Sequence, residues 1–178
     1  MSFVDPDTVT NPGAGVPITA AWGQQIVDND RALWAGMSQP WASWVPDLSL
    51  INAPNDLEWE AYTHRIGHHI NGHFGYRMGA STTYSAGTVE FDLPFEAGNT
   101  GPLVIGEWIA EDSSAGRFHS GLIILKDGST TLAQLVHQTP TSNGGLVSNT
   151  IPFTWASGDG LSGSINYHAL AAPAGALV

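Results

Sequence analysis

Hydrophobic and polar residues alternate along most of the chain from residue 57 onward. The alternation is clearest over residues 68–78, where one side of the segment is apolar and the other is polar. The apolar positions are Ile70, Phe74, Tyr76 and Met78, and the polar positions are His69, Asn71, His73 and Arg77. A period of two places successive side chains on opposite faces of a strand, so this segment is predicted to be a strand with one buried face.

Turn-forming residues separate this segment from other stretches of the same kind. Further strands are predicted at 41–50, 57–66, 88–94, 103–110, 117–125, 132–137, 152–160 and 163–170. The pair Asp127-Gly128 stands at a favoured hairpin position between two of them. A parallel sheet would need crossover helices, and no helical pattern lies between these segments. The sequence therefore predicts a mainly β fold, an antiparallel β-sandwich or jelly roll of about eight strands.

One short α-helix is predicted before the strands. Thr19 is a candidate N-cap and Gly36 a candidate stop. Between them one helical face carries Trp22, Ile26, Asn29 and Leu33. The residues before the helix are rich in Pro, Gly and Asx, which predicts an extended arm. The chain is therefore divided into an arm and helix (1–40), a β-sandwich (41–170) and a small apolar tail (171–178).

Composition and charge restrict the classes of partner. The 178 residues include 5 Lys and Arg against 16 Asp and Glu, a net charge of -11. Nucleic-acid binding, which needs basic side chains to neutralise phosphates, is close to excluded, and attraction to an anionic membrane surface is disfavoured. There is no cysteine for a disulfide or a thiolate site. No secretory signal is expected at the start, and no stretch approaches the ~20 apolar residues of a membrane helix.

Four histidines within ten residues raise the question of a metal site: His64, His68, His69 and His73. On a strand, His69 and His73 would lie roughly 13 Å apart on one face, and His68 would point to the other. Metal-ligand nitrogens must lie within about 2.1 Å of one ion. We therefore expect no metal and interpret these histidines as polar-face residues. A threefold axis that gathers three copies of one histidine remains an alternative.

Catalytic patterns are weak or missing. Glu58 and Glu60 share a predicted strand face about 6.6 Å apart by backbone rise, near the carboxylate separation of glycosidases. Nothing in the sequence marks one of them as buried, however. There is no G-x-S-x-G motif, and Lys126 is followed by Asp-Gly rather than by the Ser or Thr of a phosphate loop. We expect no enzymatic activity and no cofactor.

The tryptophans leave two interpretations open. Five lie in or beside predicted strands: Trp41, Trp44, Trp59, Trp108 and Trp155. Most are expected in the core, since indole rings bury a large apolar area. The alternative is that an exposed subset forms a platform on which sugar rings stack.

The predicted helix lies in the segment GVPITAAWGQQIVDNDRAL, which carries the pairs Thr19-Ala20 and Asp28-Asn29. With these pairs at the matching places, the segment is similar to the N-terminal module of structural proteins of tailed bacteriophages, especially those that infect actinobacteria. The following order of WASWVPDLSL, YTHRIG, STTYSAG, FDLP and PFTWASGDGLSGSINYHA resembles their β-sandwich. The polar HHINGH departs from the hydrophobic strand that usually follows YTHRIG, so the sandwich face that packs on a neighbouring subunit stays open.

The resemblance implies a non-enzymatic virion protein on the outer surface of the particle, assembled in the host cytoplasm as a homotrimer. It implies a capsid decoration or head-fibre protein that stabilises the shell. Trp22, Ile26 and Leu33 would then anchor it to the major capsid or tail protein. The alternative is a minor tail or receptor-binding protein that recognises host cell-wall glycan. A contiguous aromatic and carboxamide surface far from the helix would favour this alternative, and a polar distal surface over a large apolar base would favour the first role.

Overall fold

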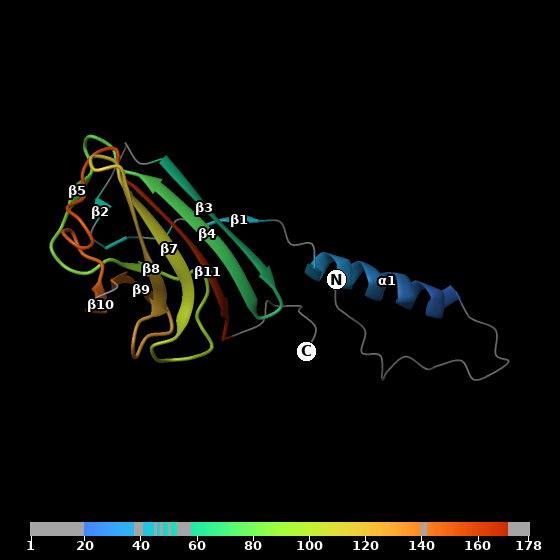
Figure 1. The fold of residues 1–178 in the computed structure, drawn as a ribbon. Helices are drawn as coiled ribbons and strands as arrows, with labels where there is room; N and C mark the ends of the chain where they lie inside the picture. The colour runs from blue at the N-terminus through green and yellow to red at the C-terminus, as the bar shows by residue number, and fades with distance from the viewer. Residues whose placement is uncertain are drawn as a thin grey trace.

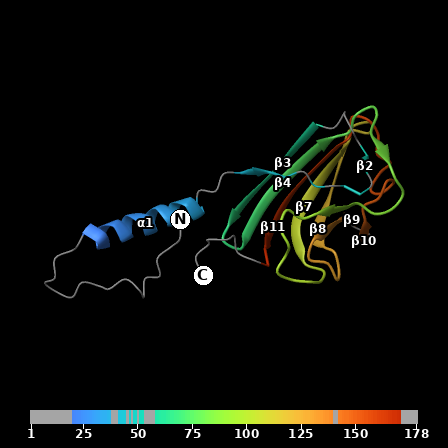
Figure 2. The same ribbon diagram turned by 180° about the vertical axis from the view of Figure 1, so that it is seen from behind.

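The computed structural model describes residues 20–37, 41–44, 46, 48–49, 51–52, 58–139 and 142–170. Helix α1 spans Ala20–Met37, and Figures 1 and 2 show it clear of the sheet. The helix continues through Gly36, so Gly36 is not its stop. The expected arm, Thr19 and the tail 171–178 lie outside the described residues. Within the described part, no helix is both long and apolar enough to cross a membrane.

Eleven strands are described (Figure 1). They are β1 (Ala42–Ser43), β2 (Ile51–Asn52), β3 (Glu58–Ile66), β4 (His69–Arg77), β5 (Thr83–Tyr84), β6 (Glu90–Asp92), β7 (Val104–Asp112), β8 (Arg117–Leu125), β9 (Leu132–Thr139), β10 (Ser142–Leu146) and β11 (Gly160–His168). Nine form one sheet in the order β1-β3-β4-β11-β7-β8-β9-β10, with β6 also paired to β9, and β2 pairs with β5. Every pairing among these strands is antiparallel, which confirms the predicted mainly β class.

The segment 41–49 links two parts of this sheet that are far apart in the strand order. At its beginning, Ser43 lies opposite Tyr62 of β3. At its end, Leu48 bridges Phe91 of β6, and the Ser49 backbone N–H donates to the carbonyl of residue 90 at 3.1 Å. Since β6 is held to β9, the sheet curls back toward its first strands and encloses one core.

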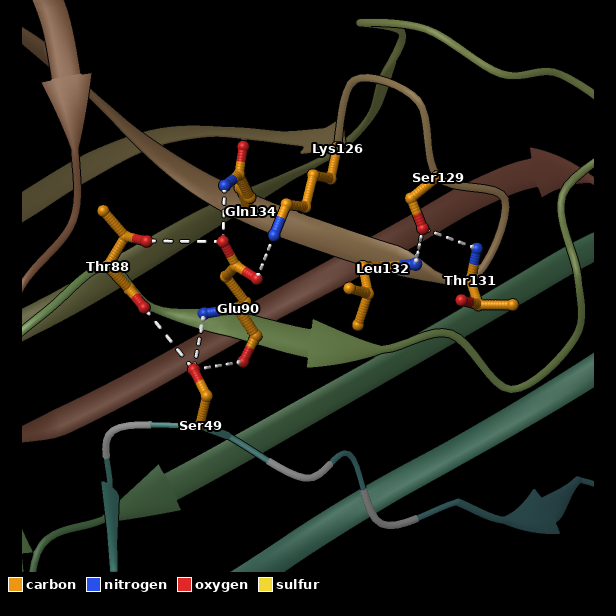
Figure 3. Close-up of polar contacts among 8 residues, drawn as sticks. All are labelled: Ser49, Thr88, Glu90, Lys126, Ser129, Thr131, Leu132 and Gln134. Atoms are coloured by element: carbon orange, nitrogen blue, oxygen red, sulfur yellow. Dashed lines mark hydrogen bonds and ion pairs between the residues drawn. The ribbon is translucent and has the colours of Figure 1, made fainter.

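A polar cluster stabilises the junction at β6 (Figure 3). The Glu90 carboxylate accepts hydrogen bonds from Lys126 Nζ and Gln134 Nε2, both at 2.7 Å, and from the Thr88 hydroxyl. Ser49 Oγ lies 3.4 Å from the Glu90 backbone nitrogen and oxygen. The hydrogen bond from Lys126 is the main cause that lowers the pKa of Glu90, and partial burial opposes it.

Alternate residues of the long strands fill the core. The predicted apolar face of residues 68–78 is confirmed, since Ile70, Phe74, Tyr76 and Met78 are all buried. They pack with inward side chains of the other strands, among them Phe91, Trp108, Ile123, Leu135, Leu161 and Ile165. Gly163 also points inward, where a Cβ would lie 2.5 Å from Phe74 Cζ, so only glycine leaves room for this ring.

Two segments differ from the sequence-based expectation. Strand β10 lies in a stretch where no strand is predicted, because Gly144 at φ 73° and a register shift beside it hide the period of two. Residues 152–159 hold no strand, although one was predicted there. Trp155 of this segment is buried, and its Nε1 donates to the Ser148 carbonyl at 2.9 Å. The strand count also exceeds the predicted number, because β2, β5 and β10 lie outside every predicted segment. Within the predicted strand 41–50 the described strand is β1, which is only two residues long.

A fully buried carboxylate fixes the loop before β11. Asp159 is 0% exposed. Its Oδ1 accepts hydrogen bonds from the backbone N–H and hydroxyl of Ser113, both at 2.9 Å, and its Oδ2 accepts from the Ala156 N–H at 2.6 Å. Burial and, secondarily, the nearby Asp159 raise the pKa of Tyr84 to about 12. The carboxylate thus joins the turn after β7 to the turn before β11.

Candidate functional site

The outer face of the sheet carries the polar halves of the alternating strands. The four strands that form its middle, β3, β4, β11 and β7, lie side by side (Figure 1). Their register aligns outward residues in rows across the sheet, and three rows matter for the site. From β3 across β4 and β11 to β7, the first row is Glu60, Gly75, Ser162 and Ile109. In the same order of strands, the second row is Tyr62, His73, Ser164 and Glu107. The third row ends at β11 and is His64, Asn71 and Asn166.

An exposed aromatic cluster lies at the β3–β4 side of these rows. The Trp41 ring centroid is 5.4 Å from that of His64 and 5.6 Å from that of His73. Tyr62 lies 5.3 Å from His73 on the neighbouring strand. Trp41 is 54% exposed and Tyr62 38% exposed, so both present ring surface to solvent. We call Trp41, Tyr62, His64 and His73 the aromatic cluster.

An open hollow of about 520 Å³ adjoins this cluster, and His73 belongs to both. Small residues form its floor, because Gly75, Ser162 and Ser164 project little or no side chain from β4 and β11. A Cβ built on Gly75 would meet no atom within 4 Å. The hollow is thus a consequence of short side chains on the outer face of two central strands.

Hydrogen-bonding groups surround the aromatic rings and the hollow. Asn166 Nδ2 donates to Asn71 Oδ1 at 3.0 Å, and the pair stands in the row next to His73. Glu60 and Glu107 line the hollow from β3 and β7. Neither carboxylate has an ion-pair or hydrogen-bonding side-chain partner among the described residues. Their oxygens are therefore available to a ligand.

This arrangement is suited to binding rather than to catalysis. Exposed indole and phenol rings provide flat apolar surface with polar edges. The surrounding hydroxyls, carboxamides and carboxylates supply donors and acceptors that fix the orientation of a ligand. A ligand with both an apolar face and many hydroxyl groups, such as a saccharide, matches this combination.

Comparison with known proteins points to bacteriophage. The chain is similar to a phage tail-fibre protein. It is 30% identical over 91 residues, 51% of its length, to the Mu-like prophage FluMu defective tail fiber protein of Haemophilus influenzae. The matched region is 14% of that protein's length, so the chain corresponds to a small part of it. No protein-family model and no solved structure matches the chain.

The tryptophans proved to be of both expected kinds. Trp44, Trp108 and Trp155 are buried, as predicted for most of them, whereas Trp41 is exposed and belongs to the aromatic cluster. The side chain of Trp59 lies outside the described part of the structure.

His64, His73 and Glu60 lie on the strand faces predicted for them. His64 and His73 lie on the polar faces of β3 and β4, where the ring of each contacts the ring of Trp41. His68 Nδ1 instead lies 3.1 Å from the Ala169 carbonyl oxygen. In the described residues, no group of three His, Cys, Asp or Glu side chains could hold a metal ion. Glu60 is exposed as expected, and the side chain of Glu58 is outside the described part.

The candidate anchoring residues are only partly described. Ile26 is 49% exposed on α1, and the neighbouring Val27 is also exposed. The side chains of Trp22 and Leu33 are outside the described part of the structure. Their anchoring role remains a prediction.

Several residues of the site were not singled out from the sequence. Glu107, Ser162, Ser164 and Asn166 come from strands far along the chain, and only the pairing of β11 with β4 and β7 brings them beside His73. The alternation did place Asn71 and His73 together on one face. No sequence signal indicated which strand would lie next to that face.

Proposed function

We propose that this chain is a structural component of a phage tail fibre and that its outer sheet face binds carbohydrate on the host cell surface. The similarity to a tail-fibre protein supports the first part. The second part rests on one observation: the exposed Trp41 ring lies against His64 and His73, beside an open hollow whose floor of small residues includes two serines. We regard the protein as non-enzymatic, in keeping with a virion structural role.

The carbohydrate proposal can be tested with the full chain on an array of bacterial surface polysaccharides. Trp41→Ala should lower binding at least tenfold, while Trp41→Phe should retain part of it, because a smaller ring still offers a stacking surface. The matched control is Ile151→Ala, which removes an exposed apolar side chain from a loop outside the site. Equal binding by wild type and Trp41→Ala would contradict the proposal, as would binding of no polysaccharide by the folded wild type.

The position of the cluster bears on how the protein is attached. Trp41 follows α1 closely in the chain. The aromatic and carboxamide surface is therefore near the helix along the sequence, whereas the receptor-binding hypothesis expected it far from the helix. We propose that residues 1–40 attach the sandwich to the rest of the fibre, with Ile26 in the contact. Removing residues 1–40 should leave a folded sandwich that no longer associates with particles, and Ile26→Asp should weaken the association. Retained association by the truncated protein would refute this attachment.

Homotrimer formation is a separate proposal. Val104, the first residue of β7, and Leu103 just before it are both exposed and would gain from burial between subunits. Light scattering at micromolar concentration should give three times the chain mass of 18.8 kDa. A capsid decoration role, expected from the sequence resemblance, gains no support from the tail-fibre similarity, and the tail assignment is therefore preferred.

A further inference from the structure

A second hollow adjoins the hollow beside Trp41 on the outer face of the sheet. A smaller hollow of about 160 Å³ shares Gly75, Ile109 and Ser162 with the first. Gly160 extends its floor, and Phe118 of β8 stands at its far wall with 68% of its surface exposed. The two hollows form one groove because they share three lining residues. An exposed aromatic ring therefore stands at each end of this groove.

The length of the groove exceeds a single sugar ring. The strand order places β7 and β11 between β4 and β8, so the ends are three to four strand spacings apart. At about 4.8 Å per spacing this is roughly 14 to 19 Å across the strands. A ligand that contacts both the aromatic cluster and Phe118 must therefore be a chain of several sugar units.

The charge of the groove restricts the ligand further. Glu60 and Glu107 contribute carboxylates to its lining, and among the residues that the structure describes no Lys or Arg lines either hollow. Glu111 at the Phe118 end is neutralised by Arg77, whose Nη2 lies 3.3 Å from its Oε2. The whole chain carries a net charge of -11. An anionic polymer would meet repulsion from two unpaired carboxylates and from the protein as a whole, whereas sugar hydroxyls can donate hydrogen bonds to those carboxylates.

We infer that the groove between the aromatic cluster and Phe118 binds an extended saccharide chain that lacks anionic groups. This inference rests on the proposed carbohydrate-binding function and adds the class of ligand. Uronic-acid polymers, sialylated chains and phosphodiester-linked glycans are excluded, and neutral polysaccharides of several units are the ligands.

The charge of the ligand is tested with the full chain on neutral and anionic bacterial polysaccharides in parallel. The wild type should bind neutral polymers and not anionic ones. The double variant Glu60→Gln, Glu107→Gln should gain measurable binding of anionic polymers, and Glu96→Gln, an exposed carboxylate outside the groove, should behave as the wild type. Binding of anionic polymers by the wild type as strongly as neutral ones would overturn the inference while leaving the carbohydrate function intact. Binding of no polysaccharide at all would overturn the proposed function itself.

The length of the ligand is tested with oligomers of one to six units prepared from the neutral polysaccharide bound most strongly, by titration calorimetry. Affinity should increase with length over several units. Phe118→Ala should lower the affinity for the longest oligomer about fivefold and leave that for the disaccharide unchanged, because the short ligand reaches only one end of the groove. A single sugar bound as tightly as the longest oligomer would overturn the inference, as would an equal effect of Phe118→Ala on short and long oligomers.

Discussion

The indole ring of Trp41 lies 5.6 Å from the imidazole ring of His73, and this contact joins the aromatic cluster to the hollow on the outer sheet face. Trp41 precedes β1, whereas His73 lies in the middle of β4 and lines the hollow. The pairing of β1 with β3, and of β3 with β4, brings the two rings together. The site is thus assembled by sheet register rather than by a local motif.

Filling the hollow should abolish ligand binding without unfolding the protein. Gly75→Gln places a side chain on the floor of the hollow, where a Cβ meets no atom within 4 Å. Stability should stay within about 1 kcal/mol of wild type, because glycine is a poor strand residue and its replacement here causes no clash. Gly145→Gln in β10, where a Cβ also meets nothing, is the matched control and should bind normally. Normal binding by Gly75→Gln would show that the ligand does not enter the hollow.

Replacing Asp159 should destabilise the fold. In Asp159→Asn one carboxylate oxygen becomes an NH₂ group, so at least one of the three N–H and O–H donors around it loses its acceptor. We expect a loss of about 2 to 3 kcal/mol in the free energy of unfolding, the cost of unsatisfied buried polar groups. Urea titration measures it. Asp127→Asn in the exposed β8–β9 turn should change stability by less than about 0.5 kcal/mol, and an equal loss in both variants would contradict the explanation.

The Glu90 cluster should make stability depend on pH in the acidic range. Because the folded-state pKa of Glu90 is lowered from the ordinary 4.5, the unfolded chain takes up the proton first as the pH falls. The contribution is therefore complete above pH 4.5 and is lost as the pH falls through the lowered pKa. Glu90→Gln should be about 1 to 2 kcal/mol less stable than wild type at pH 7. Thermal melting from pH 7 to pH 3 should show this difference shrinking in acid, and a constant difference would argue against the ion pair.

His137 should add a second pH dependence at milder acidity. Burial is the main cause that lowers its pKa below 6.5, and the nearby His119, with ring centroids 5.8 Å apart, lowers it further. As the pH falls below 6.5 the unfolded state binds the proton more readily, so stability decreases until the folded-state pKa is passed. In His137→Gln this decrease between pH 7 and pH 5 should be reduced, whereas His168→Gln on the outer face should keep it. An unchanged pH profile in His137→Gln would exclude this residue as the cause.

Much of the fold was predictable because strand alternation is a local property. The period of two identified Ile70, Phe74 and Tyr76 as core residues, and placed Asn71 and His73 on the opposite face. The prediction failed where local signals were broken. Gly144 and a register shift concealed β10, and Trp155 packs into the core from a loop, with Phe153 partly buried beside it.

The sequence by itself determined the mainly β class, the single helix, the acidic charge and the polar character of the face that carries the histidines. Only the tertiary structure decided that Trp41 is exposed, that β11 lies between β4 and β7, and that Glu60 and Glu107 line the same hollow. The physical reason is that alternation fixes which side of a strand is buried but carries no information on which strand becomes its neighbour. Neighbours are chosen by packing across the whole core, and a binding surface that spans four strands depends on that choice.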